Sequence, residues 1–563
     1  MAQPTFTVSD YILTRLKQAG LKHLFAVPGD YAAPFLTTLE SFKGIKRIGN
    51  VNELDAGYAA DGYARFAGIG AVCVQYGVGT FSVLNATAGS YVERVPVVVI
   101  TGSPSDQDRL QTRQYGILFH HSTGNLKADR EVFEAVTVAA EIISSAEEAP
   151  EKIDRAMTAL LTHHRPIYLE VYKNLWTAAC ERPKGKLKPV EPTSNSDSLK
   201  AALDAAWLRI KAAKHPVIWA GVEIQRYGLQ DTLLKLMEQS GFPFTTTSLG
   251  KTVLSEDHPQ FIGTFADEAS LLLTRLVMAK ADCMITLGDI ITDDYVDAMQ
   301  NDFCRMIVSN DEQTRVDHIV FPDVYMKDFM NGLLERFEAD QKFPRKLKLP
   351  RKLKDEPLKM QAADHLTYNR FFHQLQKFLK KNDLLPSVEL ILGESSSLYV
   401  FSNFTGLPQN GFVAQAAWGS LGHETGSSTG VGIASGKRPI VVAGDGGFMM
   451  MCQTLSTLHT NKINAIVFVM SNHVYAIEQA FVSLDAFKPG GKFAPYDELP
   501  VWNYVALAEA FGARGFRVET VGELQRVLDE ELKHEKKLPA LVEVVIPKHD
   551  LAPQIKRLAE APA

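Results

Sequence analysis

The sequence lacks the features that would mark a protein for a membrane or a nucleic acid. It contains no run of about 18 apolar residues, the length that a membrane-spanning helix needs. Lys and Arg number 59 against 65 Asp and Glu, so the net charge is −6 and no basic excess is available for nucleic acid. No apolar run follows a basic start at the N-terminus, so we expect no signal peptide. We therefore predict a cytoplasmic protein that binds neither membranes nor nucleic acids.

Cysteine is also scarce. The five cysteines are scattered and no two form a Cys-x-x-Cys, which argues against a disulfide framework or a thiolate metal site. The middle third has no Gly-x-Gly-x-x-Gly after its first apolar run, where residues 220–225 read AGVEIQ. A dinucleotide would need those glycines for close approach of its pyrophosphate, so NAD and FAD are disfavoured.

The 563 residues are enough for three to four domains of about 150 residues each. Two stretches rich in Pro, Lys and small polar residues, 182–198 and 340–364, indicate linkers. They leave three predicted domains, 1–182, 199–340 and 365–563. Each alternates short apolar runs with amphipathic segments, the pattern of a parallel sheet covered by helices. We predict an α/β protein with three consecutive doubly wound parallel-sheet domains.

The strongest local signal is Gly444-Asp445-Gly446, which ends the apolar run 438–443. A helical segment and a second apolar run follow, and that run ends at Asn472. In a βαβ unit, both strand ends lie at the carboxyl edge of the sheet, where α/β proteins bind ligands. If the strands are neighbours, the carboxylate and the amide, 27 residues apart, can share a hard cation such as Mg²⁺. Each piece alone is a common turn or strand end, and their combination predicts the site.

This segment resembles the diphosphate motif of thiamine diphosphate enzymes, a Gly-Asp-Gly followed at a similar distance by Asn. The order of the three segments also matches that family: a pyrimidine-binding domain, a central Rossmann-like domain and a diphosphate-binding domain. The resemblance implies thiamine diphosphate and Mg²⁺ as cofactors. It implies diphosphate binding at Gly444 and Gly446, and metal ligation by Asp445, Asn472 and the backbone carbonyl of Val474. The family often has Gly at the last position, but a backbone ligand tolerates that change.

Two further segments extend the resemblance. Residues 52–65 alone would indicate a helix with an acidic first turn, but they resemble the Asn-Glu-Leu run of 2-oxo acid decarboxylases. The resemblance implies that Glu53 hydrogen-bonds the pyrimidine N1′, so that the cofactor can remove its own C2 proton. Residues 418–422 resemble the family's Trp-Gly-Ser-Ile-Gly. By that match Leu421 is the apolar wedge under the bent cofactor, and the Gly419 carbonyl accepts from the 4′-amino group.

A His-His pair indicates the branch of the family. Decarboxylases of the pyruvate and indolepyruvate type carry such a pair at the position of His120 and His121, and the acetolactate synthase branch does not. A second pair, 163–164, ends a helical stretch and is predicted to lie at the surface or to cap the helix. Asp30 in a Gly-Asp-Tyr and Glu478, six residues after the metal Asn, resemble the same branch. The implied proton-relay set is Asp30, His120, His121 and Glu478.

The resemblance implies non-oxidative decarboxylation of a 2-oxo acid to an aldehyde and CO₂, through an ylide and an enamine of the cofactor. Substrate size is assigned to residues near Glu478: Ile477, Phe481 and Tyr399. Pyruvate-specific members place a Trp near the position of Tyr399, so the smaller aromatic favours branched, aromatic or medium linear substrates. Pyruvate itself remains an alternative substrate.

Two other functions are compatible with parts of the sequence. One is a carboligase or synthase of the same cofactor class, and the histidine pair and the missing dinucleotide loop argue against it. The other is a catalytically silent binding relative, which the presence of Glu53, Asp445 and Asn472 disfavours. The family implies a homodimer or homotetramer in which Glu53 and Asp445 of one site come from different subunits. The other expected partner is a small-molecule 2-oxo acid.

Overall fold

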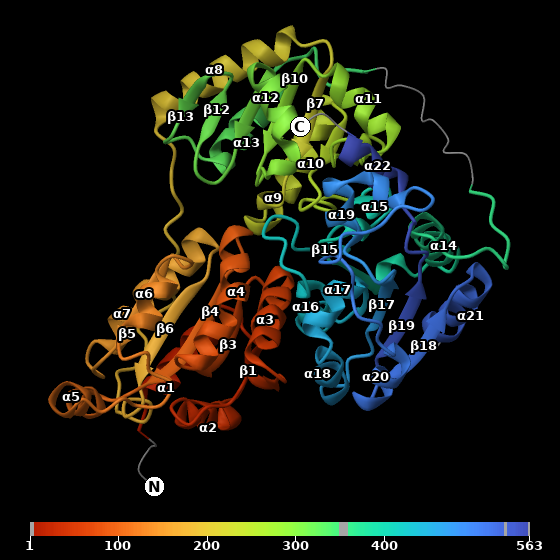
Figure 1. Ribbon diagram of the computed structural model, residues 1–563. Coiled ribbons are helices and arrows are strands. Elements are labelled where there is room, and N and C mark those ends of the chain that lie inside the picture. Colours follow the sequence, from red (N-terminus) through yellow and green to blue (C-terminus); the bar gives the residue numbers. More distant parts are fainter. Residues whose placement is uncertain (1–4, 348–357, 534–536, 561–563) are drawn as a thin grey trace.

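The computed structural model describes residues 5–347, 358–533 and 537–560. Three sheets, each with its own helices, lie around a common centre (Figure 1). The predicted fold class is confirmed. Residues 348–357 of the second predicted linker lie outside the described residues. Among the described helices, none is both long and apolar enough to cross a membrane.

The first sheet is entirely parallel, with strand order β2-β1-β3-β4-β6-β5. Its central strands β3 and β4 are buried along their whole length, as expected for strands covered on both faces. Its strands are β1 (His23–Ala26), β2 (Lys46–Gly49), β3 (Gly70–Gln75), β4 (Val97–Ser103), β5 (Ala139–Ile143) and β6 (Ile167–Tyr172). Its helices are α1 (Val8–Gln18), α2 (Ala33–Ser41), α3 (Glu53–Ala67), α4 (Val78–Val92), α5 (Asp106–Tyr115), α6 (Ala128–Phe133) and α7 (Ala149–His163).

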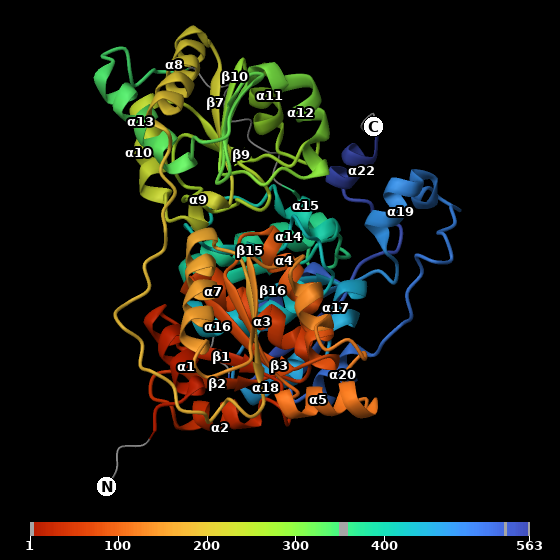
Figure 2. The same cartoon turned by 90° about the vertical axis from the view of Figure 1, so that its left-hand side faces the viewer.

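Local capping explains several of these helix ends. Thr7 and Asp10 form a capping box at the start of α1, and the Asn52 side chain caps α3 by accepting from the Asp55 amide. His164 is the left-handed C-cap of α7, as the sequence predicted for the second histidine pair. Helix α5 projects from the edge of this unit (Figure 2).

The middle sheet has the order β13-β12-β11-β10-β7-β8-β9. Strand β12 pairs antiparallel with both β11 and β13, a departure from the predicted all-parallel sheet. Its strands are β7 (Pro216–Ala220), β8 (Phe244–Thr246), β9 (Phe261–Thr264), β10 (Cys283–Leu287), β11 (Met306–Ser309), β12 (Thr314–Val316) and β13 (Ile319–Phe321). Its helices are α8 (Ser196–Ala212), α9 (Glu223–Arg226), α10 (Gln230–Ser240), α11 (Leu272–Lys280), α12 (Val296–Asp302) and α13 (Met326–Ala339), with 3₁₀ turns at Asp293–Tyr295 and Phe303–Arg305.

The last sheet, β15-β14-β16-β17-β19-β18, is again parallel and repeats the strand order of the first. Its strands are β14 (Val388–Leu392), β15 (Phe412–Ala414), β16 (Arg438–Gly444), β17 (Ile466–Ser471), β18 (Arg514–Val518) and β19 (Ala540–Val545). Its helices are α14 (Tyr368–Lys381), α15 (Ser396–Phe401), α16 (His423–Ser435), α17 (Asp445–Met451), α18 (Thr454–Thr460), α19 (Ala476–Val482), α20 (Tyr504–Ala510), α21 (Val521–Leu532) and α22 (Pro553–Glu560), with 3₁₀ turns at Leu385–Ser387 and Leu484–Phe487. Leu390 and Leu392 join one apolar cluster and Ile391 another, so both faces of this sheet are covered.

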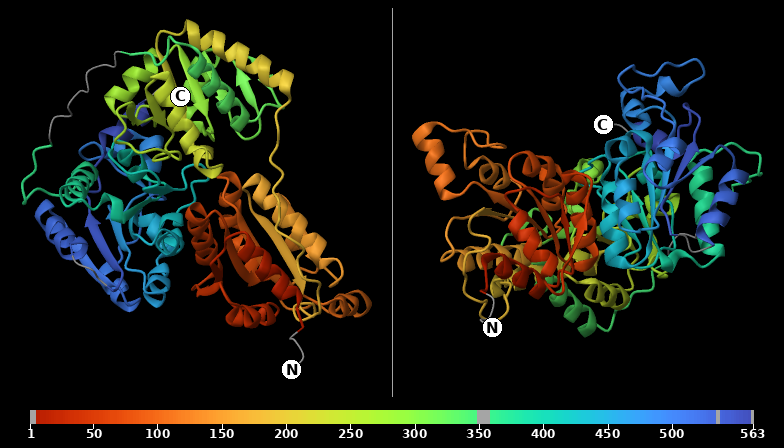
Figure 3. Two further views of the ribbon diagram at one scale, coloured as in Figure 1. Left: turned by 180° about the vertical axis from the view of Figure 1, so that it is seen from behind. Right: turned by 90° about the horizontal axis from the view of Figure 1, so that it is seen from below.

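The first and last units are joined through α3 and α16, which lie side by side (Figure 1), and Figure 3 shows the two units next to each other from behind and from below. Glycines allow their backbones to approach closely: a Cβ on Gly430 would lie 1.8 Å from the Ala59 carbonyl oxygen. A buried ionic network crosses the same contact. Arg65 binds Asp61 at 2.6 Å and Glu93 at 2.7 Å, and His423 Nε2 lies 2.8 Å from Asp61.

Candidate active site

A cavity of about 340 Å³ lies at the carboxyl ends of β14, β16 and β17. The strand order reverses between β14 and β16, so this is the topological switch point at which α/β sheets bind ligands. All the site residues predicted in the last third line this cavity: Tyr399, Gly419, Leu421, Gly444, Asp445, Gly446, Asn472, Val474, Ile477, Glu478 and Phe481.

Asp445 and Asn472 lie together because β16 and β17 are parallel neighbours, with Gly444 beside Met470. Asp445 Oδ2 accepts from the backbone N–H of Asn472 at 3.1 Å and of His473 at 2.6 Å. The Asn472 Oδ1 accepts from the Val474 amide at 3.3 Å. Burial raises the pKa of Asp445 to about 6.

This donor set fits a hard divalent cation that is completed by phosphate oxygens. Asp445 is 3% exposed, and no Lys or Arg of the described chain pairs with it, so its negative charge has no side-chain counterion. In the same described residues, no group of three or more His, Cys, Asp or Glu side chains could hold a metal alone. A carboxylate, an amide and a backbone carbonyl leave positions that Mg²⁺ commonly fills with water and phosphate.

Glycines of the motif pack closely against neighbouring side chains. A Cβ on Gly446 would lie 2.2 Å from Cε1 of Tyr475, which also lines the cavity. A Cβ on Gly447 would meet the Glu424 carboxylate at 2.8 Å. Glycine is therefore required at both positions by the neighbouring side chains, and diphosphate binding at Gly444 and Gly446 stays a prediction.

Two further carboxyl groups line the cavity. Glu424, two residues after the Gly422 that ends the wedge segment, accepts from the Gly422 amide at 3.1 Å, and burial raises its pKa to about 7. Burial, with the nearby charges of Asp294, Glu93 and Glu478, raises the pKa of Glu394 to about 8. Neither carboxyl group was predicted as a site residue from the sequence, although Glu394 lies two residues after the end of β14. Both can hold a proton near neutral pH beside Glu478.

The remaining predicted residues gather at the equivalent edge of the first sheet. Asp30 follows β1, and its Oδ1 accepts from Gln75 Nε2 at 2.7 Å. Glu53 is the first residue of α3, and a Cβ on Gly79 would lie 3.5 Å from its Oε1. No hydrogen bond or ion pair joins Glu53 to another described side chain, so its carboxylate is available to a ligand.

The predicted histidines lie on an exposed loop beside this edge. The Tyr76 hydroxyl donates to the His120 carbonyl, and the Tyr76 and His121 rings meet edge to face, 5.9 Å between centroids. A Cβ on Gly77 would lie 1.9 Å from the His121 carbonyl oxygen, so only glycine permits this approach. Asp30, Glu53, His120 and His121 therefore form one group around the end of β3.

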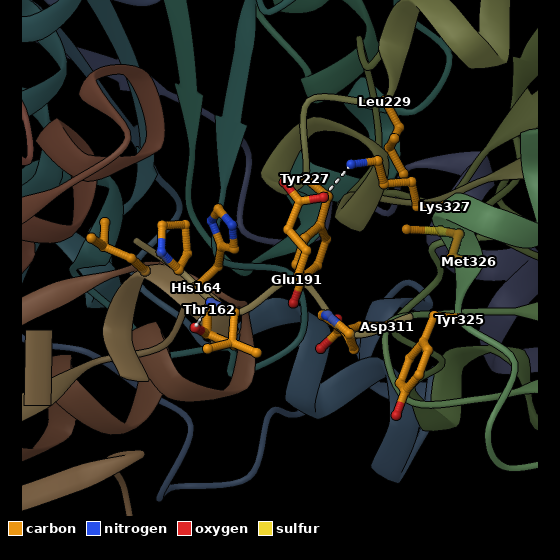
Figure 4. A pocket seen from close by; sticks show the side chains of 13 residues that line it. Thr162, His164, Glu191, Tyr227, Leu229, Asp311, Tyr325, Met326 and Lys327 are labelled. Atoms are coloured by element: carbon orange, nitrogen blue, oxygen red, sulfur yellow. Dashed lines mark hydrogen bonds and ion pairs between the residues drawn. The ribbon is translucent and has the colours of Figure 1, made fainter. Parts of the chain in front are cut away.

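Within one chain, the group of Asp30, Glu53, His120 and His121 does not line the cavity of Asp445. Every described residue lining the cavity of Asp445 comes from positions 368–481, and none comes from the first sheet. A different cavity, of about 150 Å³, lies between α7 and the middle unit (Figure 4) and is bordered by the Lys327–Glu191 ion pair. None of the predicted site residues lines it.

Comparisons with known proteins agree with this architecture. Residues 6–126 match the N-terminal, 203–335 the central and 395–544 the C-terminal domain of thiamine pyrophosphate enzymes. The chain is 30% identical to pyruvate decarboxylase 4 of Arabidopsis thaliana, over 98% of this chain and 90% of that protein. It is 29% identical to a pyruvate decarboxylase of Candida glabrata, over 97% and 96%. Identity to pyruvate decarboxylase isozyme 1 of Saccharomyces cerevisiae is 28%, over 97% and 96%.

Proposed function

The chain belongs to the thiamine pyrophosphate-dependent 2-oxo acid decarboxylases, and from this premise we propose its substrate, its metal and the roles of its residues. The enzyme uses thiamine diphosphate to decarboxylate a 2-oxo acid. We propose that it prefers branched, aromatic or medium linear substrates to pyruvate. The observation that carries this proposal is a second cavity, of about 590 Å³, that shares Glu394, Tyr399, Gly419 and Phe481 with the first.

We assign Mg²⁺ to Asp445, Asn472 and the carbonyl of Val474, because Asp445 is buried without a cationic partner in the described chain. Gly444 and Gly446 would accommodate the diphosphate. When bound, the thiazolium ring supplies the electron sink for the electrons released as CO₂ leaves. Leu421 would hold the cofactor bent from below, with the Gly419 carbonyl as a hydrogen-bond acceptor beside it.

The side chains of this protein would then handle protons and exclude water. Glu53 fixes the protonation state of the pyrimidine by sharing a proton at N1′. Glu478, which lines the cavity, acts in the decarboxylation and protonation steps, with Asp30 and His121 assisting the later ones and His120 orienting them. The apolar walls at Ile477 and Phe481 disfavour the charged carboxylate of the substrate relative to the neutral state that follows loss of CO₂.

We propose that each complete site forms between two chains, in a homodimer or a pair of dimers. Large apolar side chains are exposed next to both groups: Leu118 at 66% and Tyr115 at 73% before the histidines, Phe481 at 56% and Val482 at 62% after Glu478. Exposed apolar surface of this kind is typical of a contact surface. The five free thiols fit a cytoplasmic location, where cysteines stay reduced.

The test is aldehyde release, coupled to alcohol dehydrogenase and NADH. The enzyme receives thiamine diphosphate and Mg²⁺ and is offered pyruvate and a branched, an aromatic and a medium linear 2-oxo acid. We expect aldehyde, loss of activity in Glu53→Gln, and the highest kcat/KM for a substrate longer than pyruvate. Highest kcat/KM for pyruvate would refute the size preference, and CO₂ with an acyloin product would identify a carboligase.

A further inference from the structure

The second cavity lies between the middle and last units, which both contribute lining residues. Its outer wall consists of residues around the 3₁₀ turn Asp293–Tyr295 and the start of α12, with Leu558 and Ala559 of α22 opposite. Its inner wall is Tyr399, Glu394, Gly419 and Phe481, which also line the cavity of Asp445. A substrate side chain that passes Tyr399 therefore enters a space bordered by the middle unit.

One hydrogen bond joins the two units at this wall. The Tyr399 hydroxyl donates to Asp294 Oδ1 at 2.8 Å, and the other carboxylate oxygen of Asp294 accepts from the Thr292 hydroxyl at 3.2 Å. Tyr399 is 8% exposed, so its hydroxyl has little access to water and uses protein acceptors: Asp294 accepts its hydrogen bond, and the Glu394 carboxyl is a second neighbour. The position of the phenol ring, and with it the passage between the two cavities, is held partly by a residue of the middle unit.

The outer cavity is also lined by several acidic side chains. Asp267, Asp293 and Asp297 line it together with Asp294, and no Lys or Arg is among its described lining residues. Charges that face one cavity with low-dielectric walls reinforce each other's potential. In the proposed reaction the keto and carboxylate groups of a 2-oxo acid lie near Glu478, so only the far end of its side chain meets this wall.

We propose that Asp294 is a specificity-determining residue of this decarboxylase. It anchors Tyr399 at the passage between the inner and outer cavities, and its charge rejects 2-oxo acids that carry a second carboxylate at the end of the side chain. The enzyme therefore selects monocarboxylic 2-oxo acids of limited length. This inference rests on the proposed function, because it places the substrate side chain toward Tyr399.

The charge is tested with a matched pair of substrates, 2-oxohexanoate and 2-oxoadipate, which differ only in a terminal methyl or carboxylate. We expect the wild type to have the higher kcat/KM for 2-oxohexanoate. Asp294→Asn should reduce this preference about five- to tenfold, mainly because the variant binds 2-oxoadipate more tightly and so has a lower KM for it. Asp293→Asn is the control, since it removes the same charge from the same cavity without touching Tyr399. Because charges in one cavity reinforce each other, Asp293→Asn should also weaken the preference, and it should leave the chain-length profile unchanged. A preference within twofold of wild type in Asp294→Asn would overturn the proposal.

The anchoring role is tested with Asp294→Ala. Asparagine keeps an acceptor for the Tyr399 hydroxyl and alanine does not, so only alanine should let the enzyme convert the longer acid 2-oxodecanoate more efficiently relative to 2-oxohexanoate. Both efficiencies are measured as kcat/KM. Equal chain-length profiles for the two variants would refute the anchor. Because Asp294 is at the solvent boundary, both variants should keep the unfolding temperature of the wild type.

A binding measurement separates this inference from the proposed reaction. Calorimetry on the holoenzyme with 2-hydroxyhexanoate and 2-hydroxyadipate uses ligands that have no keto carbon to react. Weaker binding of the dicarboxylate, relieved in Asp294→Asn, supports the inference even if no aldehyde is released from any substrate. Equal affinities for the two ligands in the wild type would refute it while leaving the decarboxylase activity intact.

Discussion

A site shared by two chains predicts that two inactive variants restore each other. Glu53 is not among the described residues that line the cavity of Asp445, all of which come from the last unit. Glu53→Gln removes the carboxylate that shares a proton with the cofactor, and we expect at least about a hundredfold loss of activity from that change. Asp445→Asn removes the only carboxylate among the proposed metal ligands, and its homodimer should lose activity to a similar background.

Coexpression of the two variants in equal amounts has a defined outcome. Random pairing makes about half of all dimers mixed, and in each mixed dimer one site combines an intact Glu53 with an intact Asp445. About a quarter of all sites are then complete, and the preparation should show about a quarter of the wild-type activity per chain. Pairing of dimers into tetramers does not alter this fraction.

The assay is aldehyde release with the substrate that the wild type converts fastest, and the ratio of the two chains is checked by mass spectrometry. Separately purified homodimers, mixed and assayed at once, serve as the control and should stay at background. If each site were built within one chain, no chain of the coexpressed mixture would carry both residues. Activity equal to the sum of the two homodimers would therefore refute the two-chain site.

Three further predictions concern the contact between the first and last units. Arg65→Met leaves two buried carboxylates without their partner and should lower the free energy of unfolding by about 3–5 kcal/mol in urea titration, while Arg526→Met, at an exposed pair, should change nothing measurable. Gly430→Ala should cost about 1–3 kcal/mol and lower the melting temperature, because its Cβ would overlap the Ala59 carbonyl. Burial raises the pKa of Asp61, but the charge of Arg65 and the neighbouring histidine hold that pKa below its ordinary value of 3.8. The stabilisation by the Asp61 carboxylate is then complete above the ordinary pKa and lost as pH falls toward the lower folded-state pKa, so the difference in melting temperature between wild type and Asp61→Asn should shrink as pH falls below about 4.

The strands that the sequence predicted are those buried on both faces. Strands β3, β4, β14 and β16 read as continuous apolar runs because helices cover both sides of the sheet. The edge strand β2 carries no such signal. In β2, which reads Lys-Arg-Ile-Gly, only Ile48 is buried, since one side of an edge strand faces water.

Some residues of the candidate site could be predicted from residues near them in the sequence, and others could not. The proposed metal group could be predicted because a single βαβ unit supplies Asp445 and Asn472 at neighbouring strand ends. Glu53 and the histidines were identified through family resemblance, because their spacing alone also fits an ordinary helix start and an ordinary loop. Neither local spacing nor the family resemblance pointed to Asp294, because it lies 105 residues before Tyr399 and in the middle unit.

The repeated strand order gives a physical reason for a shared site. In both outer sheets the order reverses between the first and third strands, so each has its own switch point. Asp30 and Tyr76 follow the strands at one switch point, and Ser395 and Asp445 follow those at the other.

The loops after the second strand of each sheet correspond as well. One carries Glu53 and leads into α3, and the other carries Leu421 and leads into α16. Within the chain these two helices pack on each other through glycines. In this arrangement Glu53 has no partner among the described side chains. The described lining of the Asp445 cavity comes from the last unit alone. A second copy related by a twofold axis can bring each first-sheet group to the other chain's cavity, and the same contact then completes two sites at once. A dimer in which both chains use the same contact surface is therefore the smallest assembly in which every first-sheet group lies at an Asp445 cavity.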